Sequence, residues 1–122
     1  MFNDPQSMTL GGGAKSLSRI GVANPDRLGK FKTADGVYEV QLRQNQTNKR
    51  FRREAVVTFT KNATDPFTAE ITQQSASVIV AFDEPKVVSF TDAELADCFT
   101  GLSAWLSAST NANALKLLGG ES

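Results

Sequence analysis

Apolar and polar residues alternate along three segments of the chain, 37–44, 49–61 and the later half of 67–82. Successive side chains of a strand point to opposite faces of a sheet, so this period of two predicts β-strands with one apolar and one polar face. The positions that share the apolar face are Tyr38, Val40, Leu42, Phe51, Ala55, Val57, Phe59, Ala76, Val78, Val80 and Phe82. Arg53 also falls on the apolar side, which is consistent either with a side chain that reaches past the end of the sheet or with a β-bulge.

Glycine and other turn-forming residues divide these segments from one another. Residues 7–20 contain Gly11-Gly12-Gly13 between two short alternating runs and predict a β-hairpin, since glycine adopts positive φ without steric cost. Residues 27–32 predict a further, weak strand. The other expected breaks are a turn at Ala34-Asp35-Gly36, a polar turn at 45–48, a short loop at 62–66 and a stop at Asp83-Glu84-Pro85.

The last third of the chain changes from a period of two to a helical period. Thr91-Asp92-Ala93-Glu94 matches a capping box, which predicts that a helix begins there. The apolar residues that recur at helical spacing are Leu95, Cys98, Phe99, Leu102, Trp105 and Leu106. Ser109-Thr110-Asn111 interrupts the pattern, and a second helix at about 112–118 is expected to end at Gly119-Gly120. The sequence thus predicts an α+β fold in one domain, 1–122, with a hairpin at 7–20, an antiparallel meander sheet at 27–82 and two helices at 91–118.

The apolar stripe of the first helix is wider than a surface helix needs, which leaves two arrangements open. The helices could fold back on the sheet of their own chain, or they could be covered by a second copy of the protein. A last strand that has no proline within it could also pair edge to edge with such a copy.

Composition narrows the kinds of chemistry available. The chain has no histidine and a single cysteine, Cys98, which excludes a Ser-His or Cys-His nucleophile, a histidine-bound zinc and an internal disulfide. Cys98 is expected in the core. No apolar run is long enough for a membrane helix, and no secretory signal opens the sequence. We expect no enzymatic site, no metal, no cofactor and no membrane partner.

The net charge of zero hides an asymmetry between the two halves. Residues 1–61 hold 11 Lys and Arg against 5 Asp and Glu, a balance of +6, whereas residues 62–122 hold 2 against 8, a balance of −6. This split indicates either self-association of opposite surfaces or a basic face with an anionic partner. Arg43, Arg50 and Arg52 are predicted on the polar face of adjacent strands, where guanidinium groups could hold phosphates and stack on unpaired bases; a merely solvated face is the alternative.

The order of these elements resembles that of one family, the coat proteins of single-stranded RNA bacteriophages (leviviral coat proteins). The local likeness lies in Gln41-Leu42-Arg43-Gln44, a polar turn, and Asn48-Lys49-Arg50-Phe51, which is similar to the family's Arg-Gln pair followed by an Asn-basic-basic-aromatic run. The Gly-Gly-Gly-Ala-Lys sequence at 11–15 resembles that of some members. The element order covers nearly the whole chain, and the local signature covers about fifteen residues.

The resemblance implies an interlocked homodimer, in which two sheets join edge to edge and each chain's helices pack over the partner's sheet. The helix residues expected at that interface are Leu95, Phe99, Leu102, Trp105 and Leu106. Dimers would then assemble into an icosahedral capsid, with T=3 symmetry the usual case, so that the protein is part of a virion assembled in the bacterial host cytoplasm.

The resemblance also implies that the polar sheet face lines the capsid and binds single-stranded genomic RNA, with a translational repressor role through an RNA hairpin as an additional function. The expected RNA-binding residues are Gln41, Arg43, Lys49, Arg50, Arg52, Glu54, Gln73, Ser75 and Ser77. This sequence departs from the family in placing carboxylates at Glu39 and Glu54, and Ser75 where some members have a stacking tyrosine. General RNA packaging is compatible with these departures. The alternative function is a cellular dimeric RNA- or single-strand-binding β-sheet module, which would stay a soluble dimer.

Overall fold

The computed structural model describes residues 2, 4–24, 28–87 and 90–121. Within these residues it contains strands β1 (Gln6–Leu10), β2 (Gly13–Asn24), β3 (Leu28–Lys32), β4 (Tyr38–Gln46), β5 (Arg50–Thr64) and β6 (Ile71–Pro85), followed by helix α1 (Asp92–Leu118). The chain divides into two compact units, Met1–Lys86 and Val87–Ser122. The first unit holds the sheet and the second holds the helix.

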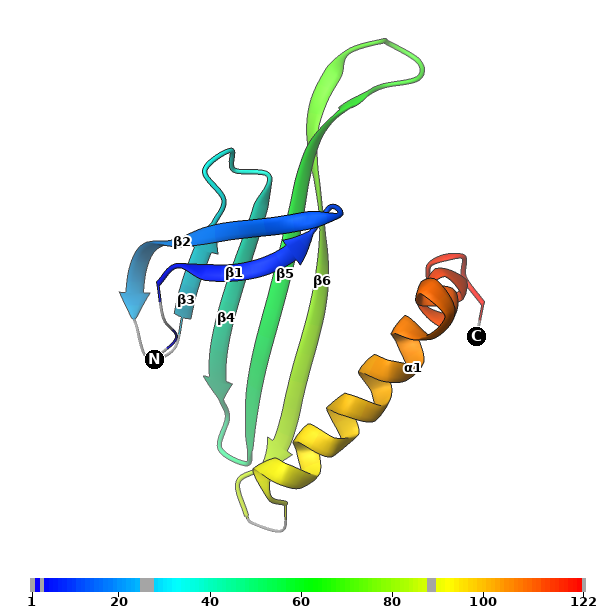
Figure 1. The fold of residues 1–122 in the computed structure, drawn as a ribbon. Helices are drawn as coiled ribbons and strands as arrows, with labels where there is room; N and C mark the ends of the chain where they lie inside the picture. Colours follow the sequence, from blue (N-terminus) through cyan, green and yellow to red (C-terminus); the bar gives the residue numbers. More distant parts are fainter. Residues whose placement is uncertain (1, 3, 25–27, 88–89, 122) are drawn as a thin grey trace. The chain divides into compact units, whose positions relative to one another are not determined.

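The strands form an antiparallel meander in which each strand pairs with the next, in the order β1-β2-β3-β4-β5-β6 (Figure 1). The pairing of β4 with β5 runs without a break from Tyr38↔Phe59 to Gln46↔Phe51. That of β5 with β6 runs from Arg50↔Pro85 to Thr64↔Ile71. The predicted α+β fold with an N-terminal hairpin and a meander sheet is confirmed.

This register places the alternating residues on two faces. Residues that stand opposite one another share a face, so Tyr38, Phe59 and Ala76 lie together on what we call the apolar face. The opposite face, which we call the polar face, carries Lys30, Lys32, Glu39, Gln41, Arg43, Arg50, Arg52, Glu54, Val56, Thr58, Thr60, Gln73, Ser75, Ser77, Ile79 and Asp83. No register shift occurs at Arg53, so it belongs to the apolar face without a bulge.

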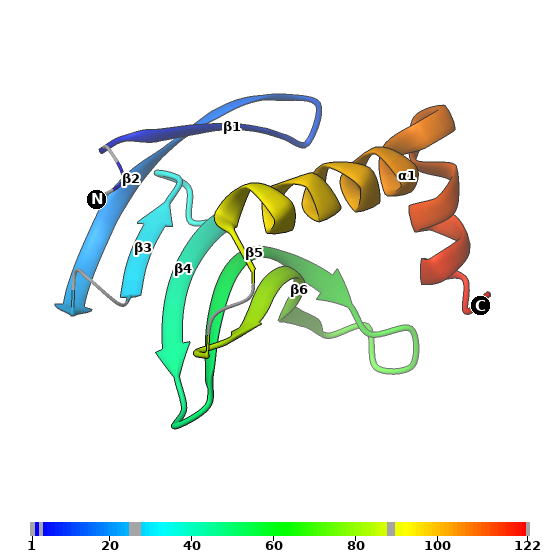
Figure 2. The same cartoon turned by 90° about the horizontal axis from the view of Figure 1, so that it is seen from below.

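The core of the first unit lies between the apolar face and the β1–β2 hairpin, which crosses over the sheet (Figures 1 and 2). Leu17 and Phe31 are fully buried and pack with Val40, while Met8 and Leu42 pack around them. The turn of the hairpin also approaches the sheet closely, because a Cβ atom on Gly11 would lie 2.6 Å from the Tyr38 hydroxyl oxygen. Gly11 has φ +61° as well, so glycine is required there on two counts.

Two expected boundaries are wrong. The expected loop at 62–66 lies instead at 65–70, because β5 continues to Thr64 and β6 begins only at Ile71, so the paired strands form a longer arm (Figure 1). The expected stop at Asp83-Glu84-Pro85 does not end β6, which runs through Pro85. The physical reason is that Arg50 and Arg53 pair with Asp83 and Glu84 from the neighbouring strand, and Pro85 is the last residue of the ladder.

Helix α1 begins and ends as the sequence predicts. The Thr91 side chain accepts a hydrogen bond from the backbone N–H of Glu94 at 3.2 Å, and Gly119 is the C-terminal cap. The residues Ala108–Asn111 have non-helical dihedral angles, which separates two helical segments as predicted. The Asn113 side chain bridges this break by donating to the carbonyl oxygen of Trp105 at 2.8 Å.

Candidate nucleic-acid interface

Eight of the nine residues predicted to bind RNA lie on the polar face of β4, β5 and β6, and Lys49 lies in the turn that precedes β5. The basic residues gather near the turn between β4 and β5. Gln73, Ser75 and Ser77 are exposed toward the other end, on the β5–β6 arm. The sequence therefore placed these residues on the correct face, and their role in binding stays a prediction.

Arg43 and Arg52 share one carboxylate. Arg52 donates a hydrogen bond from Nε to Oε1 of Glu54, and a terminal nitrogen of Arg43 lies 3.6 Å from Oε2 of the same residue. The Nε atom of Arg43 in turn donates to the Gln41 side-chain oxygen at 2.6 Å. Glu54 is largely buried between the two arginines, with 11% of its side chain exposed. The Glu54 carboxylate, which the sequence places on the expected RNA-binding face, is thus paired with Arg43 and Arg52.

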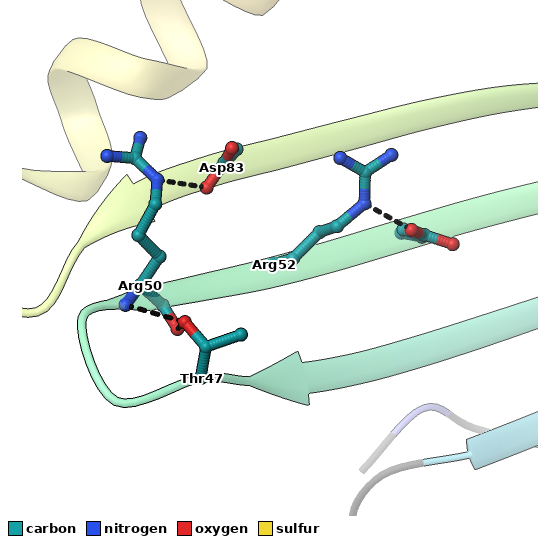
Figure 3. Close-up of polar contacts among 5 residues, drawn as sticks. Thr47, Arg50, Arg52 and Asp83 are labelled. Carbon is teal, nitrogen blue, oxygen red and sulfur yellow. Dashed lines mark hydrogen bonds and ion pairs between the residues drawn. The ribbon is translucent and has the colours of Figure 1, made fainter.

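Arg50 is held at the start of β5 by both its backbone and its side chain (Figure 3). Its backbone N–H donates to the Thr47 hydroxyl at 3.1 Å, and its Nε donates to Oδ1 of Asp83 at 2.8 Å. The Thr47 N–H returns a hydrogen bond to the Arg50 carbonyl at 2.8 Å. The turn at 47–49 therefore holds the backbone of Arg50, and Asp83 on β6 holds its side chain.

The cluster formed by Arg43, Arg50, Arg52, Glu54 and Asp83 carries one net positive charge. The hydrogen bond and charge of Glu54, with a smaller contribution from Asp83, raise the pKa of the Arg52 guanidinium above its ordinary value. The pairing with Glu54 thus stabilises the charged form of Arg52.

Two further cations belong to this face and were missed by sequence reasoning. Lys30 and Lys32 stand opposite Gln41 and Glu39 and extend the basic surface onto β3. The signal was available, because both lysines flank the apolar Phe31 with period two. The weak strand prediction for this segment did not assign a face to them.

Arg53 lies at one end of the apolar face. Its guanidinium pairs with Glu84 and stands 5.3 Å from the centre of the Phe51 ring, while the Lys86 ammonium lies 5.1 Å from the same ring. A salt bridge combined with cation–π contacts allows a charged residue at an apolar position. Arg53 is therefore separated from the polar face.

The five residues predicted at the dimer interface lie on α1. No residue of this helix is buried; Leu95 and Leu106 are partly exposed, and Leu102 and Trp105 expose more than half of their surface. Cys98, expected in the core, is exposed. In the first unit, β6 is the edge strand of the sheet and exposes Val78, at 70%, and Val80 on the apolar face. The stripe is thus confirmed as a feature of the helix, and the dimer stays a prediction.

In the described part of the chain, no group of three or more Cys, Asp or Glu residues comes together as a metal site would require. Within the same residues, no helical segment combines the length and apolar character that crossing a bilayer needs.

Comparisons with known proteins rest on structure, because a scan of family models and a search of curated proteins give no match to this sequence. The virus-like particle protein of bacteriophage AVE019 superposes with a TM-score of 0.75 at 15% identity, over 95% of each chain. That of Beihai levi-like virus 21 gives 0.68 at 8% identity, over 94% of this chain and 91% of the other. The capsid protein of bacteriophage GA gives 0.61 at 12% identity, over 96% and 95%. The chain therefore has the fold of the levivirus coat proteins.

Proposed function

We propose that this chain is the coat protein of a small single-stranded RNA bacteriophage, and that its dimers assemble into an icosahedral capsid of T=3 symmetry around genomic RNA. The observation that carries the proposal is the structural likeness to a virus-like particle protein over 95% of both chains. Because the likeness covers 95% of both chains, it supports a shared role for the whole fold and not for one part of it. The protein would act in the virion, after assembly in the cytoplasm of a bacterial host.

The dimer is supported by the apolar surface that the single chain leaves exposed. Leu102 and Trp105 on α1, and Val78 on β6, are all more than half exposed. Burying such residues in an obligate interface, which commonly covers on the order of 2,000 Å² or more, is favourable because apolar surface leaves water. A second copy that pairs with the edge of β6 would also satisfy its outer backbone groups.

RNA packaging is supported by the charge of the polar face. Five cations, three arginines and two lysines, share this face with Glu39, Glu54 and Asp83, so it carries a net charge of about +2 per chain. A dimer doubles this charge on one continuous surface. Gln41, Ser75 and Ser77 add hydrogen-bonding groups that can reach bases or 2′-hydroxyls, and any hairpin preference, with the repressor role that depends on it, would reside there.

Expression in bacteria tests the proposal directly. We expect closed particles by negative-stain electron microscopy, with an ultraviolet absorbance ratio that indicates packaged host RNA. Treatment of the intact particles with ribonuclease should leave that RNA protected. Soluble dimers without nucleic-acid absorbance under all conditions would contradict the proposal and favour a cellular dimeric RNA- or single-strand-binding module.

A further inference from the structure

We propose that Glu54 and Asp83 are positioning residues for RNA binding, which hold Arg52 and Arg50 with their terminal nitrogens directed at phosphates of single-stranded RNA. This role rests on the proposed packaging function and divides the polar face into residues that contact RNA and residues that orient them. Both acids are thereby given a part in binding, although their charge repels phosphate.

Arg50 and Arg52 each donate a hydrogen bond from Nε to a carboxylate. Arg52 donates from Nε to Glu54, and Arg50 donates from Nε to Asp83. Figure 3 shows the terminal nitrogens of both guanidinium groups directed away from these hydrogen bonds. Among the described residues, no hydrogen bond occupies those terminal nitrogens. Each side chain is about half exposed, at 52%. A planar guanidinium held in this way presents a two-nitrogen fork to solvent, and such a fork matches two oxygens of a phosphate.

The spacing of the two forks fits a nucleic-acid strand. Arg50 and Arg52 are two residues apart on β5 and share a face, so their Cα atoms are about 6.5–7 Å apart along the strand. This is close to the separation of successive phosphates along an RNA strand. The pair is therefore suited to two neighbouring phosphates of one extended strand.

Arg43 has a different role. Its Nε is engaged by Gln41 at 2.6 Å and one terminal nitrogen faces Glu54 at 3.6 Å, so it has less capacity left for phosphate. Arg43 instead braces the Glu54 carboxylate from the β4 side, opposite Arg52. Among the three arginines expected to bind RNA, Arg43 would therefore contribute less direct contact than Arg50 and Arg52.

Orientation matters because a flexible arginine loses conformational freedom when it binds. A side chain already fixed by a carboxylate loses less, and the gain appears as tighter binding. Charge alone does not produce this gain. The two contributions can be separated by variants that keep the charge and change only the geometry.

The first test replaces arginine by lysine, which keeps the positive charge but has neither Nε nor a fork. The probe is polyuridylate, and the affinity of the purified RNA-free protein is measured over a series of salt concentrations. We expect Arg50→Lys and Arg52→Lys each to weaken binding on the order of tenfold, because an ammonium cannot reproduce the oriented fork that holds a phosphate. Arg53→Lys, on the apolar face of the same strand, is the matched control and should bind as the wild type does. Wild-type affinity in both Arg50→Lys and Arg52→Lys would overturn the proposal.

The second test separates the charge of each acid from its hydrogen bond. Glu54→Gln removes the charge and keeps an oxygen that can accept from Arg52, whereas Glu54→Ala removes both. We expect Glu54→Gln to bind RNA more tightly than wild type and Glu54→Ala to bind several-fold more weakly than Glu54→Gln at equal net charge. Asp83→Asn and Asp83→Ala should show the same order. Equal affinity within each pair would mean that the acids act by charge alone and would overturn the proposal, with thermal unfolding used to confirm that each variant is folded.

The outcome distinguishes this proposal from the packaging function on which it rests. If the wild type binds RNA and Arg52→Ala weakens it, but the geometry-changing variants behave as their charge predicts, RNA binding by this face stands and the orienting role fails. If the wild type shows no salt-dependent RNA binding, the packaging function fails and the orienting role fails with it.

Discussion

Leu17 of the β1–β2 hairpin and Phe31 and Val40 of the sheet are buried against one another in the first unit, whereas no residue of α1 is buried in the second. The same contrast runs across the sheet, because Val40 on β4 is buried while Val78 on β6, which shares its face, is 70% exposed. In the first unit, apolar side chains of a single chain bury one another. The second unit leaves large apolar side chains exposed, so under the proposed dimer the contrast predicts which substitutions act on folding of the chain and which act on association.

The largest expected effect comes from a charge in the exposed helix stripe. Leu102→Asp places a carboxylate where the interface of the proposed dimer is apolar. An obligate dimer that cannot associate also loses its fold, because its isolated monomer is not stable. We therefore expect loss of soluble, folded protein, measured by circular dichroism and analytical ultracentrifugation. Ala104→Asp, on the opposite side of the same helix, is the matched control and should remain a folded dimer. A wild-type protein that sediments as a folded monomer at micromolar concentration would remove the basis of this prediction.

Two phenylalanine substitutions compare the buried core with an exposed position. Phe31 is fully buried and Phe67, in the loop at 65–70, is 95% exposed. Phe31→Ala should lower the free energy of unfolding by about 3–5 kcal/mol, since it removes a large buried side chain and leaves a cavity. Phe67→Ala should change it by less than about 0.5 kcal/mol. Denaturant unfolding at one fixed protein concentration measures both, and similar values for the two variants would contradict the core described here.

Because Phe67 is exposed, the Phe67→Ala variant also tests the assembly of particles. Phe67 stands in the loop that joins β5 to β6, where a neighbouring dimer of the proposed capsid would cover its exposed ring. We expect Phe67→Ala to keep the dimer and to reduce the yield of closed particles, because the aromatic ring would pack between neighbouring dimers. Particle yield by sucrose-gradient sedimentation, beside the dimer content, separates this effect from unfolding. Unchanged particle yield would show that Phe67 does not contribute to assembly.

Alanine substitutions at two glycines of the hairpin turn distinguish the energetic cost of backbone strain from that of a steric contact. Gly11 and Gly12 both have positive φ, so alanine at either position costs about 1 kcal/mol or more in the free energy of unfolding. Only at Gly11 would the new Cβ meet another group, the Tyr38 hydroxyl at 2.6 Å, while Gly12 faces open space. We expect Gly11→Ala to be more destabilising than Gly12→Ala by about a further 1–3 kcal/mol, the usual effect of overpacking. Equal losses would mean that the hairpin does not rest on Tyr38.

The local pattern of the sequence predicted most of the fold. Alternation placed Tyr38, Val57 and Val80 on one face and Arg43 and Arg52 on the other, and the register confirms it. Thr91 and Gly119 marked the ends of the helix because capping chemistry is local. The end of β6 was not predictable in this way, because its continuation through Pro85 depends on ion pairs with residues more than thirty positions earlier.

The candidate site shows the same division. The face that carries Arg50 and Arg52 follows from period two, but the partner of each arginine does not. Glu54 is two residues from Arg52 and could have been paired with it from the sequence, whereas Asp83 comes opposite Arg52 and beside Arg50 only when β6 is in register. Lys30 was missed although it flanks Phe31 with period two, because the weak strand was not assigned a face until β3 was paired with β4. Long-range register therefore supplied what local pattern could not.

The smallest expected effect concerns the loop at 65–70, which is ordered from within the chain although it presents Phe67 to solvent. The Asp65 side chain accepts a hydrogen bond from the backbone N–H of Phe67 at 2.8 Å, and this bond is the main reason that the pKa of Asp65 lies below its ordinary value. A carboxyl whose pKa is lowered in the folded state stabilises that state above its unfolded pKa, about 3.9, and this contribution disappears as the pH falls through the lower folded value. We expect amide hydrogen exchange at Phe67, corrected for its intrinsic pH dependence, to show less protection once the pH is below that range. In Asp65→Asn, protection should be lower than in wild type at neutral pH and should not change across the acidic range, since the amide does not titrate. Protection at Phe67 that is independent of pH in the wild type would show that Asp65 does not hold the loop, and the order of this arm would then have to come from contacts between chains, as proposed for α1.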